Sequence, residues 1–189
     1  MENKFYDSIL KYLLIKKYIC DEEKELYMYA IKTLIRGFIN ITAVFIIGLL
    51  LDMLKESAFM FLSFFILRSF AGGIHSEKYI SCFLWSSIIN IIGLILIKNS
   101  WYISKNAFIT IVIVFCLLIV LFSPIKHPHK HITHKETKMY KIVASIFAFT
   151  ICVISIILVI TGCFDEIGYS LGTGLVISSI LMVCGKIKY

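Results

Sequence analysis

A histidine and a cysteine stand seven residues apart in one short segment of the sequence. His75 follows the glycine pair Gly72-Gly73, and Cys82 lies just inside the hydrophobic run that comes next. A cysteine thiolate is a strong nucleophile and an imidazole can transfer protons for it, so this combination is typical of cysteine enzymes. The pair is the main candidate for chemistry in the chain. The alternative is a loop histidine and a packed cysteine that never meet.

The spacing restricts how the two side chains can meet. On one continuous helix, at 1.5 Å per residue, His75 and Cys82 would be about 10 Å apart along the axis, which is too far for a hydrogen bond. A catalytic pair therefore predicts that the backbone breaks or folds between Ile74 and Tyr79. Cys82 would then lie in the first turn or two of the next helix. The glycine pair before His75 can adopt the backbone angles that such a turn needs.

Three further residues of this region are candidates for supporting roles. Positive charge near a thiol favours the thiolate form, and Arg68 and Lys78 can supply that charge or bind the substrate. Ser86 lies one helical turn beyond Cys82 and is a candidate hydrogen-bond donor in the site. Packing between helices is the alternative role for this serine.

The composition predicts an all-α integral membrane protein. The chain is 59% hydrophobic with a mean hydropathy of +0.90, far above a soluble domain. A helical span needs about 20 apolar residues, and about six hydrophobic helices are expected from the apolar stretches 37–51, 57–67, 79–97, 107–122, 142–164 and 167–184. The second stretch is short, so the first two either span the membrane or form a re-entrant hairpin that leaves four spans. No signal peptide is expected, because residues 1–36 are polar and charged.

The charge distribution indicates a membrane partner and not nucleic acid, despite the net charge of +7. With six spans and a cytoplasmic N-terminus, 16 of the 19 Lys and Arg residues face the cytoplasm, as the positive-inside rule requires. If the second stretch alone failed to span, the division would be nearly even, which is disfavoured. A hairpin would keep the orientation. We therefore expect a multi-pass protein of the cell membrane with both termini in the cytoplasm.

The polar segments suggest two domains, a cytoplasmic amphipathic segment at 1–36 and a multi-span domain at 37–189. Apolar residues fall on one face of 1–36, which predicts a helix that either lies on the membrane surface or packs against the protein's own cytoplasmic side. The loop at 123–134 contains His127, His129, His131 and His134. Metal binding is one interpretation, but a solvated loop facing lipid headgroups is favoured, and we expect no metal and no cofactor. The cysteines other than Cys82 are interpreted as packing residues.

The pattern Arg-x3-Gly-Gly-x-His-x6-Cys, formed by Arg68, Gly72, Gly73, His75 and Cys82 between two apolar stretches, resembles the accessory gene regulator B family. These are integral-membrane cysteine endopeptidases of Gram-positive quorum-sensing systems. The resemblance extends over essentially the whole chain. It implies that the histidine and the cysteine are catalytic, and that the arginine and the glycines match residues of the family motif.

The resemblance implies a specific reaction on a short autoinducer precursor peptide. The thiolate of Cys82 would attack a backbone carbonyl, and His75 would protonate the departing amine. An internal Cys or Ser of the precursor would then attack the thioester and close a thiolactone or lactone ring. The family also suggests a homodimer. It often carries Gln or Glu at the position that Lys32 occupies here, with Glu25 or Asn40 as alternatives, so no third catalytic residue is assigned.

Other classes of protein compete with this interpretation. A small membrane transporter or peptide exporter would be expected to carry ionisable residues within its spans, and the apolar stretches contain almost none. A non-catalytic membrane scaffold would not need the thiol of Cys82. An acyltransferase acting on lipid headgroups would use His75 without the thiol.

Overall fold

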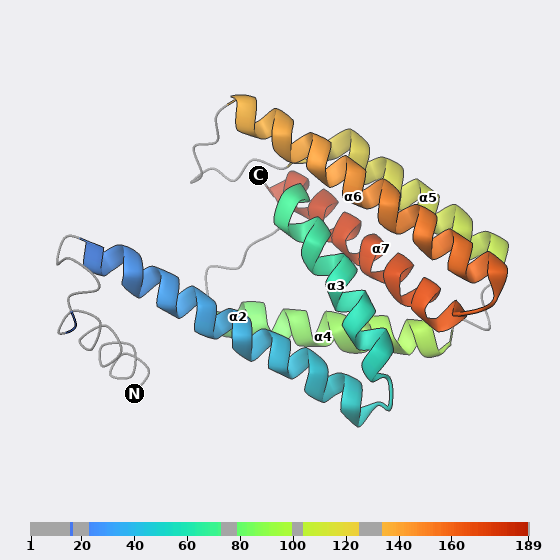
Figure 1. Ribbon diagram of the computed structural model, residues 1–189, viewed down its shortest axis with the longest axis horizontal. Coiled ribbons are helices and arrows are strands. Elements are labelled where there is room, and N and C mark those ends of the chain that lie inside the picture. The colour runs from blue at the N-terminus through green and yellow to red at the C-terminus, as the bar shows by residue number, and fades with distance from the viewer. Residues whose placement is uncertain (1–15, 17–22, 73–78, 100–103, 125–133, 189) are drawn as a thin grey trace. The chain divides into compact units, whose positions relative to one another are not determined.

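The structure is a computed structural model that describes residues 16, 23–72, 79–99, 104–124 and 134–188. These residues form helices and connections without any strand (Figure 1). The helices are α2 (Lys24–Leu50), α3 (Leu54–Ala71), α4 (Tyr79–Lys98), α5 (Lys105–Phe122), α6 (His134–Thr161) and α7 (Asp165–Lys188). Each corresponds to one predicted apolar stretch, although the stretches 37–51 and 142–164 run past the ends of α2 and α6, so the expected all-α class with about six hydrophobic helices is confirmed.

Five of the described helices are long and apolar enough to cross a membrane: α2, α4, α5, α6 and α7. The helix that falls outside this group is α3, which contains the short stretch 57–67. Its 18 residues include Lys55, Glu56 and Arg68. The chain therefore has the helices of a multi-pass membrane protein, and the doubtful stretch of the sequence is also the exceptional helix of the structure.

The chain divides into two compact units, Met1–Ala43 and Val44–Tyr189. The described part of the first unit is chiefly the N-terminal portion of α2. The predicted amphipathic face of residues 1–36 lies mostly outside the described residues, and the domain boundary at residue 36 stays a prediction. The second unit contains the C-terminal end of α2 and the five helices α3 to α7.

Glycine and serine residues define several helix ends. Gly72 follows α3 with φ of 77°, and its amide donates to the carbonyl of Arg68 at 3.2 Å. Gly162, between α6 and α7, has φ of 70°. These left-handed angles are easily adopted only by glycine, and they satisfy carbonyls at the end of a helix. At the start of α5, the hydroxyl of Ser104 accepts a hydrogen bond from the amide of Ala107.

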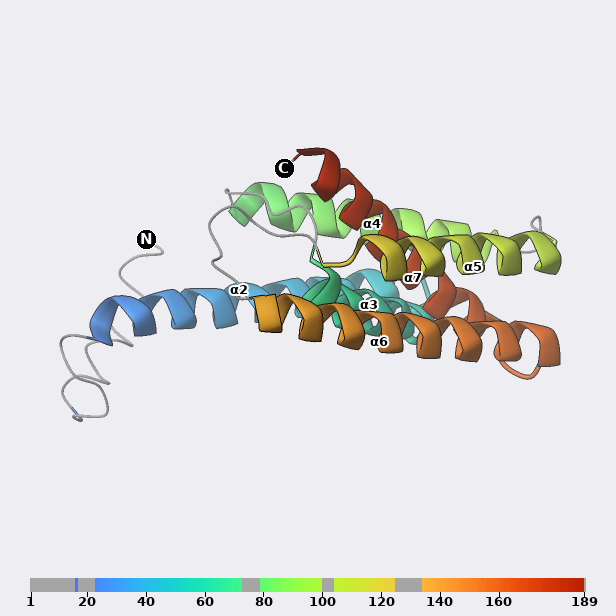
Figure 2. The same cartoon turned by 90° about the horizontal axis from the view of Figure 1, so that it is seen from above.

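Helix α7 is the centre of the second unit. It packs against α3, α4, α5 and α6, and Figure 2 shows it crossing between α3 and α6 on one side and α4 and α5 on the other. Its most apolar window is 61% buried, against 11–33% for the other candidate spans. The other helices expose many large apolar side chains, as expected for surfaces in contact with lipid.

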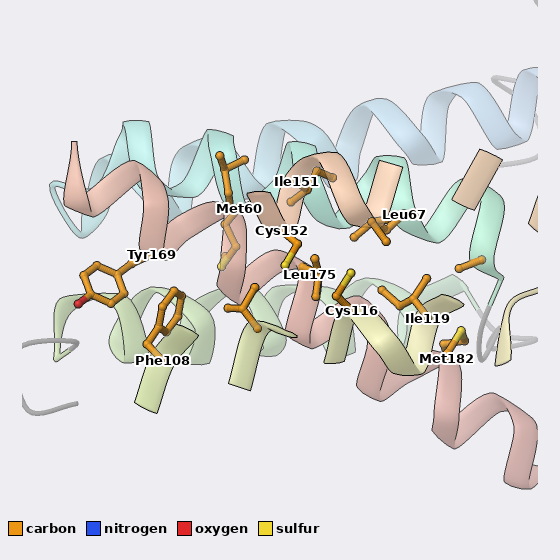
Figure 3. Packing of buried hydrophobic residues seen from close by; sticks show 14 of the residues in the cluster. Met60, Leu67, Phe108, Cys116, Ile119, Ile151, Cys152, Tyr169, Leu175 and Met182 are labelled. Atoms are coloured by element: carbon orange, nitrogen blue, oxygen red, sulfur yellow. The ribbon is translucent and has the colours of Figure 1, made fainter. Parts of the chain in front are cut away.

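Small residues let α7 approach its neighbours closely. The hydroxyl of Ser155 on α6 donates to the carbonyl of Gly168 at 2.7 Å. A side chain at Gly172 would meet Phe108 of α5 and Ser155, and one at Gly174 would meet Ser63 and Met60 of α3. Such contacts are typical of membrane helices, where packing and hydrogen bonds replace the hydrophobic effect as the cause of association. The apolar side chains of the same core fill the space between the helices (Figure 3).

An ion pair joins three helices at the end of the bundle where α6 turns into α7. The ammonium of Lys105, at the start of α5, lies 3.0 Å from the Asp165 carboxylate and donates to the carbonyl of Val159 at 3.1 Å. The carbonyl of Val159 belongs to the last turn of α6, where no helical partner is available. Lys105 therefore donates to an otherwise unpaired carbonyl at the end of α6 and also neutralises the Asp165 carboxylate.

Candidate active site

Cys82 lies in the first turn of α4, which begins at Tyr79. This is the position that the spacing argument requires of a catalytic cysteine. Its thiol is free and the side chain is partly buried. His75, Gly73 and Lys78 lie outside the described residues, so the contact between the imidazole and the thiol stays a prediction.

Arg68 is in the last turn of α3 and interacts electrostatically with Cys82 on α4. Burial lowers the pKa of the Arg68 guanidinium from its ordinary value, and the nearby Cys82 opposes that shift. The guanidinium also lies over the ring of Phe64, with Cζ 5.9 Å from the ring centroid. The fold thus brings together the arginine and the cysteine of the sequence motif from two different helices.

The end of α3 is held in place by the turn at Gly72. Its positive φ and its hydrogen bond to the carbonyl of Arg68 end the helix directly after Ala71. A residue with a β-carbon would be strained in this conformation. The glycine predicted to supply unusual backbone angles does so, and it fixes the turn of α3 that carries Arg68.

Cys82 lies near two sources of positive charge. The free amides of a helix N-terminus carry partial positive charge, and Cys82 lies in the first turn of α4. The guanidinium of Arg68 adds a full positive charge from α3. A thiolate in such surroundings can attack a carbonyl carbon or hold an acyl group as a thioester.

Ser86 lies one turn beyond Cys82 in the same helix. Its hydroxyl donates to the carbonyl of Phe83 at 2.9 Å, and Ser87 donates to the same carbonyl at 2.9 Å. These are bonds within α4. They show the hydroxyl of Ser86 paired with its own helix in this structure, so its supporting role stays a prediction.

The position expected to hold a third catalytic residue is on α2. Lys32, Arg36 and Asn40 are spaced by four residues and are partly buried, whereas Leu34 and Phe38 are more than 70% exposed. The three polar side chains therefore share one face of an otherwise apolar helix. They belong to the first unit and Cys82 to the second, and no third catalytic residue is assigned.

The histidine-rich loop gives no metal site within the described residues. His127, His129 and His131 lie outside them, and His134 is the first residue of α6. Among the residues that the structure does describe, no group of three or more His, Cys, Asp or Glu side chains could hold a metal ion.

Phe64 is a member of the site that the sequence analysis did not name. It precedes Arg68 by four residues, so the two side chains lie on the same face of α3. An aromatic ring one turn before an arginine is a signal for a cation–π contact. The ring restricts where the guanidinium can lie and so helps to position its charge.

Comparisons with known proteins agree with the motif. The family model described as Accessory gene regulator B matches residues 3–184. A protein described as AgrB-like from Clostridium perfringens (strain SM101 / Type A) is 37% identical over 174 residues, which cover 86% of this chain and 78% of that protein. A second AgrB-like protein, from strain 13 / Type A of the same species, is 38% identical over 128 residues, which cover 64% of this chain and 60% of that protein. No solved structure matches the chain.

Proposed function

The chain belongs to the accessory gene regulator B family, and on that premise we propose that it is a membrane-embedded cysteine endopeptidase that cleaves a short autoinducer precursor peptide. Family membership supports a role in accessory gene regulator autoinducer processing. The finer proposal depends on one observation. Cys82 lies in the first turn of α4, partly buried, where the Arg68 guanidinium interacts with it.

The proposed reaction begins with the Cys82 thiolate. Its sulfur attacks a backbone carbonyl of the precursor, and His75 gives a proton to the departing amine, so that the C-terminal part of the precursor leaves. The rest of the peptide remains on Cys82 as a thioester. Arg68 balances negative charge on the sulfur before the attack and when the acyl group leaves. It acts as a positioning and electrostatic residue in this scheme.

The second half of the reaction closes a ring. An internal Cys or Ser of the precursor attacks the thioester carbonyl, which forms a thiolactone or lactone and frees the Cys82 thiol. Water competes for the same carbonyl. Ile80, Leu84 and Trp85, close to Cys82 on α4, are all more than half exposed, as suits side chains that face lipid. A reaction at the edge of the hydrocarbon region meets less water, which favours cyclisation over hydrolysis.

The precursor would meet the enzyme at the cytoplasmic face of the cell membrane. This orientation follows from the distribution of Lys and Arg, with both termini in the cytoplasm. Lys78 and the glycine pair stay in the proposal as supporting residues of the site, and a homodimer stays a prediction from the family resemblance. No nucleic acid takes part in the scheme.

The proposal is tested by co-expressing the protein with the precursor peptide and measuring the peptide products by mass spectrometry. We expect a C-terminal fragment with the wild type and none with Cys82→Ala or His75→Ala. Cys163→Ala is the matched control, because Cys163 is an exposed thiol in the short turn between α6 and α7. Intact precursor with a well-inserted wild type would overturn the peptidase proposal and favour a transporter or a scaffold.

The thioester is tested separately by adding hydroxylamine to the reaction of a precursor whose internal Cys or Ser is replaced by Ala, so that no ring can form. Hydroxylamine cleaves a thioester, so the N-terminal part of the precursor should appear as a hydroxamate. Its formation should require Cys82. A C-terminal fragment without any hydroxamate would indicate direct hydrolysis, in which case the enzyme is a peptidase but the cyclisation scheme is wrong.

A further inference from the structure

Asn90 is a buried polar residue of α4 whose amide nitrogen has no hydrogen-bond partner among the residues that the structure describes. Its side chain is 5% exposed, and Nδ2 itself is inaccessible. By contrast, the amide of Asn99, directly after the same helix, donates to the carbonyl of Ile95 at 2.9 Å. An unpaired donor in an apolar core is unfavourable, and an apolar side chain of the same shape would be more stable there. Asn90 is therefore a candidate for binding an acceptor that a ligand supplies.

Asn90 lies where α4 joins the bundle. Every side chain from Ile80 to Ile89 is exposed or partly buried, whereas that of Asn90 is buried. Figure 1 agrees with this change, because the N-terminal half of α4 diverges from α3 and α7. A side chain at Gly93, one turn further along, would meet Met60 of α3 and Ile177 of α7. The amide of Asn90 is therefore at the inner end of the region in which α4 separates from its neighbours.

Asn90 is on the same side of α4 as Cys82. Cys82, Ser86 and Asn90 follow one another at intervals of four residues, so each is about 40° around the helix from the one before. Burial increases along the series, from the partly buried Cys82 and Ser86 to the buried Asn90. At 1.5 Å per residue, Asn90 is about 12 Å along the axis from Cys82. An extended peptide covers that distance with about three or four residues.

Helix α4 is the helix of the second unit that can move most easily. Among α3 to α7 it packs least extensively, chiefly against α3 and α7. Weakly packed elements separate from a protein at the lowest free energy. The side chain closest to Gly93 is the thioether of Met60, and methionine adapts its shape to its surroundings. A peptide can therefore reach Asn90 along α4 while the contacts of α7 with α3, α5 and α6 stay intact.

We propose that Asn90 is a substrate-binding residue whose amide donates a hydrogen bond to a backbone carbonyl of the precursor peptide. The identity of this peptide rests on the proposed function. The carbonyl is about three or four residues from the scissile bond, in the part that remains on Cys82 as a thioester, because the released part must leave for the cytoplasm. Away from water a peptide carbonyl needs a donor, and a neutral amide suits a neutral carbonyl better than a carboxylate.

The binding test uses Cys82→Ala protein in lipid nanodiscs, which can bind the peptide without cleaving it. The probe is the precursor of the cleavage test with a fluorophore at its N-terminus. Adding Asn90→Leu removes the donor and keeps the shape of the side chain, and it should raise the Kd about fivefold or more. Adding Asn99→Leu instead should leave the Kd unchanged, because that amide bonds to its own helix. An equal Kd in all three proteins, or no binding to any of them, would overturn the proposal.

A change in the peptide identifies the partner of the amide. A thioamide accepts hydrogen bonds more weakly than an amide does. Placed about three or four residues before the scissile bond, it should weaken binding to the Cys82→Ala protein. The same thioamide should have little effect once Asn90→Leu is present, since the two changes remove one interaction. Equal losses of affinity in both proteins would show that Asn90 does not bind this part of the peptide, and the proposal would be wrong.

Folding and catalysis are measured in the active protein. Asn90→Leu should unfold at the same temperature as the wild type or higher, because it removes an unpaired donor from the core. Its kcat/KM for the precursor should fall about fivefold or more, while Cys82 should react with a small maleimide at the wild-type rate. If the wild type binds the precursor through Asn90 without cleaving it, the peptidase proposal fails and this inference stands. Wild-type cleavage by Asn90→Leu would have the opposite meaning.

Discussion

Arg68 and Cys82 interact electrostatically although they belong to different helices, α3 and α4. The cation lies at the end of one helix, and the thiol lies in the first turn of the next. Both the guanidinium and the amides of the α4 N-terminus carry positive charge on the side of the sulfur. This arrangement connects the reactivity of Cys82 to a residue that makes no covalent contact with substrate.

Replacing Arg68 should slow the reaction of Cys82 with maleimides. Loss of a charge–charge interaction of about 1 kcal/mol corresponds to a rate about fivefold lower for Arg68→Ala at neutral pH. Arg68→Lys should retain part of the rate, because it keeps the charge but loses the planar contact with Phe64. Labelling of Cys163, measured in the same sample, should not change. A rate for Cys82 that is equal in all three proteins would contradict the electrostatic role.

Cys82 should be alkylated faster than either Cys116 or Cys152 in the folded protein. Cys82 is partly exposed, whereas the other two are almost completely buried. We expect a difference of at least about tenfold with a membrane-permeant reagent, since only thiolates in accessible sites react. His75→Ala should reduce the Cys82 rate if the imidazole contacts the thiol. In the unfolded protein the three rates should converge.

Gly174→Ala should destabilise the bundle. A β-carbon at this position would meet the hydroxyl of Ser63 and the backbone carbonyl of Met60, and the backbone atom cannot move away on its own. Overpacking of this kind costs about 1–3 kcal/mol. Gly37→Ala is the matched control, because a β-carbon there meets nothing within 4 Å. Thermal unfolding in detergent should show a lower midpoint for the first variant only, and equal midpoints would show that α3 and α7 can separate at little cost.

Lys105→Met should cost more stability than Asp165→Asn. The carboxylate variant loses an ion pair that is partly exposed, and such pairs contribute about 0–1 kcal/mol. The lysine variant loses the same pair and also leaves the carbonyl of Val159 without its partner, which adds about 1 kcal/mol. Chemical unfolding of both variants measures the difference. Equal losses would mean that the carbonyl finds another donor.

The positions of the helices could be predicted from hydropathy because lipid requires long apolar segments. The central position of α7 in the bundle could not be predicted in this way. Ser170, Thr173 and Ser178 make it the least apolar of the candidate spans, with a mean hydropathy of 1.8, yet it is the most buried. In a membrane the side chains that face other helices are the polar and small ones. The least apolar stretch is therefore a signal for the centre of a bundle.

Only the parts of the site that depend on residues close in sequence could be predicted. The motif named Arg68 and Cys82, and the spacing required a new helix to begin close to Cys82, as α4 does at Tyr79. The electrostatic interaction between Arg68 and Cys82 could not be predicted, because it depends on how α3 packs against α4.

The central position of α7 has a consequence for the synthesis of the protein. Helix α3 carries three charged residues and packs most extensively against α7. During synthesis α3 leaves the ribosome first of the two, and α4, α5 and α6 must follow before α7 is made. During that interval the serines and charges of α3 lack their final surroundings. We therefore expect a membrane insertase to bind and shield α3 in the nascent chain. Folding of the bundle should finish only after α7 has been translated.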